Sequence, residues 1–301
     1  SAMIGGILRQ GIFSKEDIIV SNLTPEGKAR SEKNLGVVTT LDNKEVVRSA
    51  KTVVLAVKPQ FYEEVLDEVH DSLTEEHTII GIAPGKTLAW LEEKAGLPLK
   101  VVRFMPNTPA QVGEGMTAVC ANERVSQDEL AEILKITDSF GCTEVIPERL
   151  MDAAGAVGGC APAYVFMFIE AMADAAVSQG MPRKQAYKFA SQTVLGSAKM
   201  VLETGRHPGD LKDMVCSPAG TTIEGVRTLE KNGFRSAVFE ALTAAAEKGK
   251  KLLKASNGQA AKYPPPDLIR FSIVTDMKKL RVILPSCRLH GVFLSYVSYR
   301  I

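Results

Sequence analysis

Strand-like and helix-like segments alternate along the first half of the chain, and the strand-like segments stop at Pro147. The clearest strand is Thr52–Val57, which is continuously apolar, as a strand buried on both faces of a parallel sheet must be. Further strands are predicted at 17–20, 37–39, 78–82, 101–105, 116–121 and 143–146. Helix patterns fill most of the intervals, with start signals at Thr24–Pro25 and Ser126–Glu129. This alternation predicts an α/β fold with a doubly wound, Rossmann-type parallel sheet.

Only helix patterns follow Pro147, and the first long one, 163–179, is apolar nearly all round, with Glu170 and Asp174 as its only charges. A helix of this kind has to be buried on every side. In a helical domain of about a hundred residues, a second subunit is the most economical cover, so we expect an obligate oligomer. The predicted domains are a Rossmann-like domain at 1–147, an all-helical domain at 148–253 and a tail at 254–301.

The composition excludes several classes of function. The 301 residues are 45% hydrophobic and 24% charged with a net charge of +1, so nucleic acid is not indicated as a partner. No apolar run approaches the ~20 residues that span a bilayer, and no signal-peptide pattern opens the chain, so a cytoplasmic protein without a membrane partner is expected. The five cysteines and four histidines show no Cys-x-x-Cys or metal-spaced pair, which argues against a metal site or a disulfide framework.

Small and polar residues follow four of the predicted strands, at Ser21–Asn22, Lys58–Pro59, Ala83–Gly85 and Pro106–Pro109. In doubly wound sheets, ligands bind beyond the carboxyl ends of the strands, so a dinucleotide is expected along this rim. Each segment alone is also ordinary turn chemistry, since Pro, Gly, Asn and Ser dominate turns. The Gly-x-Gly-x-x-Gly turn expected between the first strand and the first helix would fall immediately before Ser1, where the sequence looks cut.

A second candidate site lies in the segment 213–230. Helical periodicity stops at Cys216, a small-residue turn covers Ser217–Gly220, and periodicity then resumes. The first turn of the new helix should expose backbone N–H groups and the hydroxyls of Thr221 and Thr222, which suits a small carboxylate or phosphate. The alternative interpretation is an ordinary corner between two helices with a capping threonine.

Together these segments resemble a known family. The resemblance rests on Thr52–Pro59, Met105–Pro109, Ala161–Tyr164, His207–Gly209 and, above all, Val215–Thr222. They are similar to the pyrroline-5-carboxylate reductases, over about residues 1–252. The resemblance implies a nucleotide-binding domain followed by an all-helical domain that forms an interlocked homodimer, often assembled further into a decamer. It also implies the last step of proline biosynthesis, an NAD(P)H-dependent hydride transfer to the C=N bond of 1-pyrroline-5-carboxylate that gives L-proline.

The resemblance also implies roles for the rim residues. Ser21, Asn22 and Asn43 would line the adenosine ribose and its phosphate. Since no acidic residue stands at Ser21–Asn22 to bind a ribose 2′-hydroxyl, NADPH is favoured without excluding NADH. The residues expected to run along the coenzyme toward the nicotinamide are Ala56, Val57, Lys58, Pro59, Ala83 and Pro84. For Lys58, simple solvation of a strand end is the alternative.

In the helical domain, the resemblance implies a clamp for the substrate carboxylate, made by backbone N–H groups and the Thr222 hydroxyl. The clamp residues are Ser217, Gly220, Thr221 and Thr222. Such a clamp would hold the imine carbon at near-attack distance from the nicotinamide C4. Because the imine can protonate before hydride arrives, positioning would carry the catalysis, and no strong candidate for a catalytic acid is visible.

The sequence departs from the family's pattern in three places. The first strand and its glycine turn are absent, so a severe loss of coenzyme affinity is expected. At Gly158 the family usually has serine. The tail 254–301 holds eight Lys or Arg against two acidic residues, and its run Gly291–Tyr299 is β-prone. The tail is interpreted as a frame-shifted or fused end without stable order; a basic extension that binds a partner or a membrane surface is the alternative.

Two alternative functions stay open at this point. One is an inactive or fragmentary relative that keeps only the oligomerising helical domain. The other is a further NADP enzyme of the β-hydroxyacid dehydrogenase plan. That enzyme would need a catalytic lysine on the first long helix of the second domain, and the segment Ala161–Met181 contains none.

Overall fold

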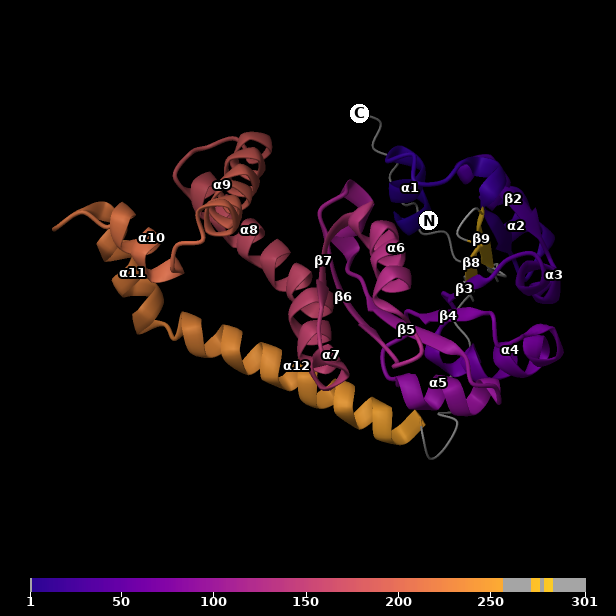
Figure 1. The fold of residues 1–301 in the computed structure, drawn as a ribbon. Coiled ribbons are helices and arrows are strands. Elements are labelled where there is room, and N and C mark those ends of the chain that lie inside the picture. Colours follow the sequence, from indigo (N-terminus) through magenta and orange to yellow (C-terminus); the bar gives the residue numbers. More distant parts are fainter. Residues whose placement is uncertain (1, 257–271, 277–278, 284–301) are drawn as a thin grey trace. The chain divides into compact units, whose positions relative to one another are not determined.

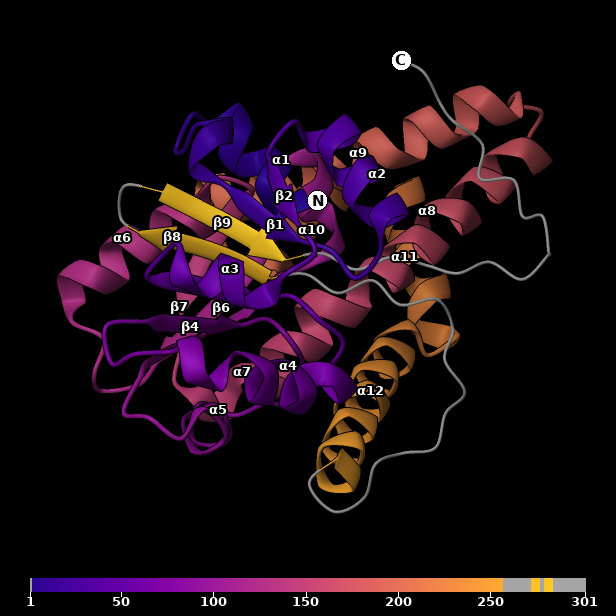
Figure 2. The same ribbon diagram turned by 90° about the vertical axis from the view of Figure 1, so that its right-hand side faces the viewer.

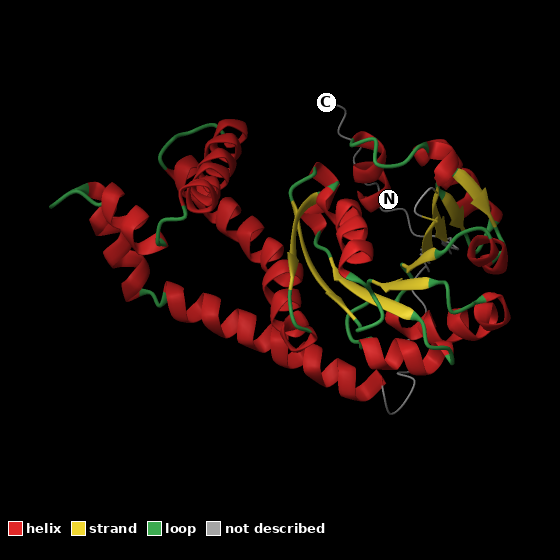
Figure 3. Cartoon of the chain, viewed as in Figure 1, coloured by secondary structure: helices red, strands yellow, loops and turns green. Residues whose placement is uncertain are grey.

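The computed structural model describes residues 2–256, 272–276 and 279–283 (Figure 1). The chain divides into two compact units: unit 1 comprises Ser1–Gly159 and Lys248–Ile301, and unit 2 comprises Cys160–Glu247. The strands of the described residues all belong to unit 1, whereas unit 2 consists of helices and their connections (Figure 3). The predicted β-prone run Gly291–Tyr299 lies outside the described residues.

The strands of unit 1 are β1 (Ile19–Ser21), β2 (Val38–Thr40), β3 (Thr52–Leu55), β4 (Thr78–Gly81), β5 (Lys100–Met105), β6 (Gly115–Ala121), β7 (Gly141–Val145), β8 (Ser272–Asp276) and β9 (Lys279–Ile283). Seven of them form one sheet in the order β7-β6-β5-β4-β3-β8-β9, and β1 pairs with β2 in a second sheet. The neighbours β3, β4 and β5 are parallel, as are β6 with β7 and β1 with β2. All seven strands predicted before Pro147 are present, and the Rossmann-type fold is confirmed.

Two pairings differ from a wholly parallel sheet. The strand β6 runs antiparallel to β5 because a short 3₁₀ turn, Thr108–Val112, joins them, whereas a parallel crossover needs a dozen or more residues. On the other side of the sheet, β8 runs antiparallel beside β3, and β9 lies beside β1 (Figure 2). The parallel order of the doubly wound sheet is therefore interrupted between β3 and β1.

The α-helices of unit 1 before residue 160 are α1 (Ala2–Arg9), α2 (Pro25–Leu35), α3 (Asn43–Arg48), α4 (Tyr62–Val69), α5 (Leu88–Ala95), α6 (Gln127–Asp138) and α7 (Met151–Ala154). The two predicted helix starts have the expected caps. The Thr24 hydroxyl accepts a hydrogen bond from the Gly27 N–H at 3.3 Å, and Ser126 and Glu129 form a capping box. These caps satisfy backbone donors that a helix start leaves without partners.

Helices cover both faces of the large sheet. On one face of the sheet, α1 and α6 pack against Val54, Ile80 and Val102. On the other face, α3, α4 and α5 pack against the preceding residues, Val53, Ile79 and Val101. This split follows from the alternation of side chains along a strand. Figure 1 shows α6 and the pair α4 and α5 on opposite sides of the strands. Both faces being buried explains why the strand sequences are continuously apolar.

Two glycines allow β6 and β7 to start side by side. Gly141 has a φ of +153°, and a Cβ added there would lie 1.9 Å from the Gly115 carbonyl oxygen. The Gly115 N–H donates to the Phe140 carbonyl at 2.9 Å. Backbones this close leave no room for a side chain, so the start of β7 requires glycine.

The helices that follow are α8 (Ala161–Ser178), α9 (Arg183–Thr204), α10 (Pro208–Val215), α11 (Thr221–Lys231) and α12 (Phe234–Ser256). A π-helical stretch, Gly155–Cys160, precedes α8. Within unit 2, the buried apolar residues are three alanines, Ala173, Ala186 and Ala190. Large apolar side chains elsewhere on the unit are exposed, among them Leu202 at 81% and Phe239 at 69%.

Candidate active site

The polar residues predicted to face the adenosine end of the coenzyme come together where β1 ends. Ser21, Asn22 and Asn43 are buried, with exposed fractions of 1%, 2% and 8%. The Ser21 hydroxyl donates to Asn43 Oδ1 at 2.5 Å, which joins the end of β1 to the start of α3. The Ser31 hydroxyl of α2 donates to Asn22 Oδ1 at 2.9 Å. Three elements thus fix these side chains in one arrangement.

A carboxylate joins this cluster from α4. Asn43 Nδ2 donates to Glu68 Oε2 at 2.6 Å, so Glu68 sets which way the Asn43 amide points. The sequence reasoning considered only the residues directly after the strand and missed Glu68. No local pattern could have found it, since the two residues lie 25 positions apart. Glu68 therefore adds a carboxylate to the cluster at the end of β1.

The segments predicted to run toward the nicotinamide follow β3 and β4. Val57 and Ala83 are buried, Ala56, Lys58 and Pro59 are half-buried, and Pro84 is exposed. Lys58 precedes a 3₁₀ turn, Pro59–Phe61, and its carbonyl accepts from the Phe61 N–H at 2.9 Å. The hydroxyl of Tyr62 donates to the carbonyl of Leu55, which ends β3, and accepts from the N–H groups of Ile82 and Ala83 after β4; no local sequence pattern predicts these contacts. The structure therefore holds the ends of β3 and β4 side by side.

A buried lysine follows the β4 segment. Lys86 is 6% exposed, and its Nζ lies 3.7 Å from the centre of the Trp90 ring. Burial lowers the pKa of Lys86, and the Glu63 carboxylate partly offsets that effect. The aromatic face stabilises the ammonium group, so Lys86 anchors the start of α5.

The predicted substrate clamp lies at the start of α11 in unit 2. Gly220 is the N-cap residue, and no side chain caps the helix, so the alternative of a capping threonine is not found. Ser217, Thr221 and Thr222 are exposed. The first N–H groups of a helix have no acceptor within the helix, and together with the helix dipole they attract an anion. The clamp residues belong to unit 2, and the rim residues belong to unit 1.

The turn that leads into α11 holds an unusual backbone conformation. The Gly220 N–H donates to the Ser217 carbonyl at 3.0 Å, which closes a four-residue turn. Ala219 has a φ of +56°. Among the described residues, it is the residue other than glycine that has a positive φ. Proline in the second position and a positive φ in the third are the marks of a type II turn, which prefers glycine at the third. The strain at Ala219 falls at the predicted clamp, where strained backbone commonly supports function.

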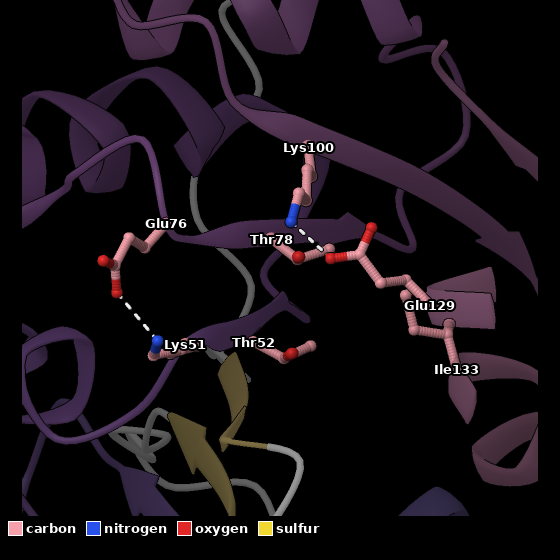
Figure 4. A pocket seen from close by; sticks show the side chains of 7 residues that line it. All are labelled: Lys51, Thr52, Glu76, Thr78, Lys100, Glu129 and Ile133. Carbon is pink, nitrogen blue, oxygen red and sulfur yellow. Dashed lines mark hydrogen bonds and ion pairs between the residues drawn. The ribbon is translucent and has the colours of Figure 1, made fainter. Parts of the chain in front are cut away.

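One cavity of unit 1, about 200 Å³ in volume, lies away from the rim. Its lining includes Thr52, Thr78 and Lys100, the first residues of β3, β4 and β5, so it opens at the amino ends of the strands (Figure 4). Its charges are paired, Lys51 with Glu76 at 2.8 Å and Lys100 with Glu129. Ligands of such sheets bind at the opposite edge, so this cavity is not assigned to the coenzyme.

The structure offers no obvious metal centre. In residues 2–256 and the two short strands that follow, no group of three or more His, Cys, Asp or Glu side chains could hold a metal ion.

Comparisons with known proteins agree with this arrangement. A family model described as pyrroline-5-carboxylate reductase dimerisation matches residues 148–252, and one described as NADP oxidoreductase, coenzyme F420-dependent, matches residues 1–85. The pyrroline-5-carboxylate reductase of Escherichia coli (strain K12) is 49% identical over 253 residues, which cover 84% of this chain and 94% of the relative. The chain belongs to the pyrroline-5-carboxylate reductases.

Other members of the family share its sequence and its fold. The pyrroline-5-carboxylate reductase of Methanosarcina acetivorans is 42% identical over 254 residues, 84% of this chain and 94% of the relative. The solved structure of the Coxiella burnetii reductase superposes with a TM-score of 0.77 at 35% identity, covering 83% of this chain and 93% of the other. The Plasmodium falciparum reductase, solved with NADP bound, gives 0.75 at 36% identity, covering 83% and 92%.

As a pyrroline-5-carboxylate reductase, the chain is an NAD(P)H-dependent oxidoreductase, and the match of its helical region to the dimerisation model supports oligomerisation. The two alternative functions, an inactive relative and another dehydrogenase of the same plan, are not favoured by these comparisons. In the described residues, one helical stretch, Glu148–Ser178, is long and apolar enough to cross a membrane, with a mean hydropathy of 1.5. The dimerisation match covers this stretch.

Proposed function

We propose that this reductase transfers hydride to the C=N bond of 1-pyrroline-5-carboxylate and releases L-proline. The protonated imine gains two electrons and one hydrogen as hydride at carbon, its C=N double bond becomes a single bond, and the nitrogen keeps its proton as a secondary amine. NAD(P)H supplies that hydride when bound and leaves as NAD(P)⁺. The protein's part is then to bind, orient and exclude water.

The single observation that carries the proposal is the uncapped start of α11 behind the turn Ser217–Gly220. Backbone N–H groups that no side chain caps, an exposed Thr222 hydroxyl and a helix dipole form a site for one small anion. The carboxylate of 1-pyrroline-5-carboxylate is such an anion. Ser217, Gly220, Thr221 and Thr222 would hold it and so fix the position of the imine carbon, which is the main contribution a reaction with little acid–base chemistry needs.

The rim of unit 1 fits a dinucleotide. Its adenosine end offers the buried hydroxyl and amide groups of Ser21, Asn22 and Asn43, which match the hydrogen-bonding needs of a sugar and its phosphate. Its other end offers the small or flat surfaces of Ala56, Val57, Lys58, Pro59, Ala83 and Pro84, which allow close approach of a ring. These residues would bind the coenzyme and keep water away from the nicotinamide.

We infer a homodimer as the basic assembly, with a decamer as a further level, and a cytoplasmic location. In unit 2, Phe166, Phe189 and Leu202 are at least 60% exposed, and an apolar surface of this kind marks a subunit interface. The dimerisation match at 148–252 supports the same assignment and the predicted domain limits of 1–147 and 148–253.

The test is the oxidation of NADPH by this chain with 1-pyrroline-5-carboxylate, compared with the Thr222→Ala and Thr228→Ala variants. Thr228 lies on the same helix, two turns from its start, and its hydroxyl donates to the Glu224 carbonyl at 3.0 Å. Thr222→Ala should raise the KM for 1-pyrroline-5-carboxylate about tenfold and leave the KM for NADPH unchanged. Thr228→Ala should change neither. An unchanged substrate KM in Thr222→Ala would contradict the clamp, and absence of turnover in the parent chain would contradict the activity itself.

A further inference from the structure

One buried hydroxyl joins the two strand ends that face the nicotinamide side of the rim. Tyr62, the first residue of α4, has an exposed fraction of 0%. Its hydroxyl donates to the carbonyl of Leu55, the last residue of β3. It also accepts hydrogen bonds from the N–H groups of Ile82 and Ala83, each at 3.0 Å, directly after β4. A tyrosine hydroxyl has one hydrogen to donate and two lone pairs, so all of its capacity is used.

The Tyr62 hydroxyl lies where the backbone hydrogen bonds between β3 and β4 end. The register of the pair runs from Thr52 opposite Thr78 to Leu55 opposite Gly81. One step further, the Ile82 N–H lies 3.5 Å from the Leu55 carbonyl, at the outer limit of a hydrogen bond. Beyond this point the Tyr62 hydroxyl holds the two backbones at a fixed separation.

The surroundings of Tyr62 keep its hydroxyl neutral and in place. Burial raises the pKa of Tyr62 far above its usual value, although its two backbone N–H donors oppose this effect. The ring packs near Trp90, with 6.4 Å between the ring centres. A Cβ added at Gly81 would lie 3.7 Å from Tyr62 Cε1 and only 2.9 Å from Leu91 Cδ1, so glycine at this position keeps the space around the ring. The hydrogen bonds thus persist across the whole working pH range.

We propose that Tyr62 is a positioning residue for the coenzyme: its hydroxyl fixes the segments Ala56–Pro59 and Ala83–Pro84 at the spacing that receives the nicotinamide. The proposal rests on the proposed function, which assigns these two segments to the coenzyme. Tyr62 itself is fully buried and acts through backbone that it holds. The nicotinamide half is common to NADPH and NADH, so Tyr62 should affect both coenzymes to the same extent.

The test compares Tyr62→Phe with Thr137→Val. Phenylalanine keeps the ring but leaves the Leu55 carbonyl and two N–H groups without their partner, so the segments should turn toward water. The Kd values for NADPH and NADH, measured by quenching of protein fluorescence, should rise about tenfold for each, with the KM for 1-pyrroline-5-carboxylate within twofold of the parent. Thr137 is equally buried, and its hydroxyl donates to the Leu134 carbonyl at 2.9 Å, far from the rim. Thr137→Val should lose stability without a change in either Kd.

Hydrogen exchange provides a second measurement on the same proteins. Peptides that cover 55–59 and 82–85 should exchange faster in Tyr62→Phe than in the parent and unchanged in Thr137→Val. Should Tyr62→Phe fail to fold, Gly81→Ala adds a Cβ beside the Tyr62 ring and Leu91 without altering a coenzyme segment, and it should raise both Kd values by a smaller, equal factor. The positioning role is overturned if the Kd values for NADPH and NADH in the variant stay at the parent value, or if only the Kd for NADPH changes. Absence of coenzyme binding in the parent chain would instead contradict the proposed function, so the two failures are distinguishable.

Discussion

Arg103 on β5 and Glu148, just after β7, form an ion pair with 2.6 Å between Nη1 and Oε1, and the Arg103 side chain is only 5% exposed. The same Glu148 oxygen accepts a hydrogen bond from the Leu88 N–H at the start of α5, at 2.7 Å. One carboxylate therefore neutralises a buried charge and satisfies a backbone donor of a third element.

Removal of this carboxylate should cost much of the stability of unit 1. In Glu148→Ala, the Arg103 charge stays buried without its partner, and we expect a loss of about 2 to 3 kcal/mol in the free energy of unfolding. Urea unfolding at one protein concentration measures it. The control is Glu144→Ala on β7, an exposed position where the loss should stay below about 0.5 kcal/mol. Equal losses in the two variants would show that the pair does not support the fold.

The ion pair between Lys100 and Glu129 should make stability depend on acid pH. The hydrogen bond from Lys100 holds the pKa of Glu129 below its usual value, and partial burial opposes this. A lowered carboxyl pKa contributes stability that is complete above the ordinary pKa of about 4.3 and is lost as the pH falls through the lower, folded value. Glu129→Gln keeps the capping box with Ser126 but not the charge. Its unfolding free energy should be about 0.5 to 1 kcal/mol below the parent at pH 6, a gap that closes as the pH falls through the lowered pKa of Glu129. A gap independent of pH would contradict this account.

The cysteines of unit 1 should differ sharply in reactivity. Burial raises the pKa of Cys120 to about 11, although the Arg103 charge opposes this, whereas Cys142 on β7 is exposed. At pH 8 only roughly one Cys120 thiol in a thousand is then the reactive thiolate. Iodoacetamide should therefore label Cys142 at least about a hundredfold faster, as followed by mass spectrometry of peptides. The Cys142→Ser protein should label slowly at Cys120 under the same conditions; rapid labelling there would refute the assignment.

Replacement of Ala219 by glycine should not destabilise the strained turn. Glycine adopts positive φ without the penalty of a Cβ, so Ala219→Gly should leave stability unchanged or raise it by up to about 1 kcal/mol. The matched control is Ala237→Gly inside α12, where loss of helix propensity should cost about 1 kcal/mol. Thermal unfolding measures both. Destabilisation of the two variants to the same degree would show that position 219 carries no strain.

Much of unit 1 could be predicted from the sequence because its central strands β3 and β4 are buried on both faces. Runs such as Thr52–Val57 have no alternating polar residues, and turn residues flank each run. The apolar runs and their flanking turns are therefore sufficient to predict the strands. The antiparallel strand β6 was not foreseen, since strand direction depends on the connection Thr108–Val112 and on nothing within the strand. The short helix α3 was also missed, because six residues are too few to show a helical period.

The candidate site divides in the same way. Rim residues such as Ser21 and Ala83 can be predicted because they directly follow strands of a parallel sheet. The clamp residues are predicted from the resemblance of Val215–Thr222 to the pyrroline-5-carboxylate reductases. Tyr62 and Glu68 act through hydrogen bonds to residues that are distant in sequence, and nothing near either residue marks that role. The positive φ of Ala219 was equally hidden, because alanine rarely takes that conformation.

The alanines at which α8 and α9 meet have a consequence for the order of the folding reaction. Ala173, Ala186 and Ala190 let the two helices approach closely, and the larger side chains around them, such as Ile169 and Met172, are only partly buried, so this small cluster offsets little of the ordering of helices of 18 and 22 residues. The larger side chains of α8 such as Phe166 at 60% and Met167 at 67% stay exposed within one chain, and a second chain of the proposed dimer would cover them. Formation of unit 2 should therefore be a second-order process, with a refolding rate that rises in proportion to protein concentration, whereas the sheet of unit 1 can form within one chain.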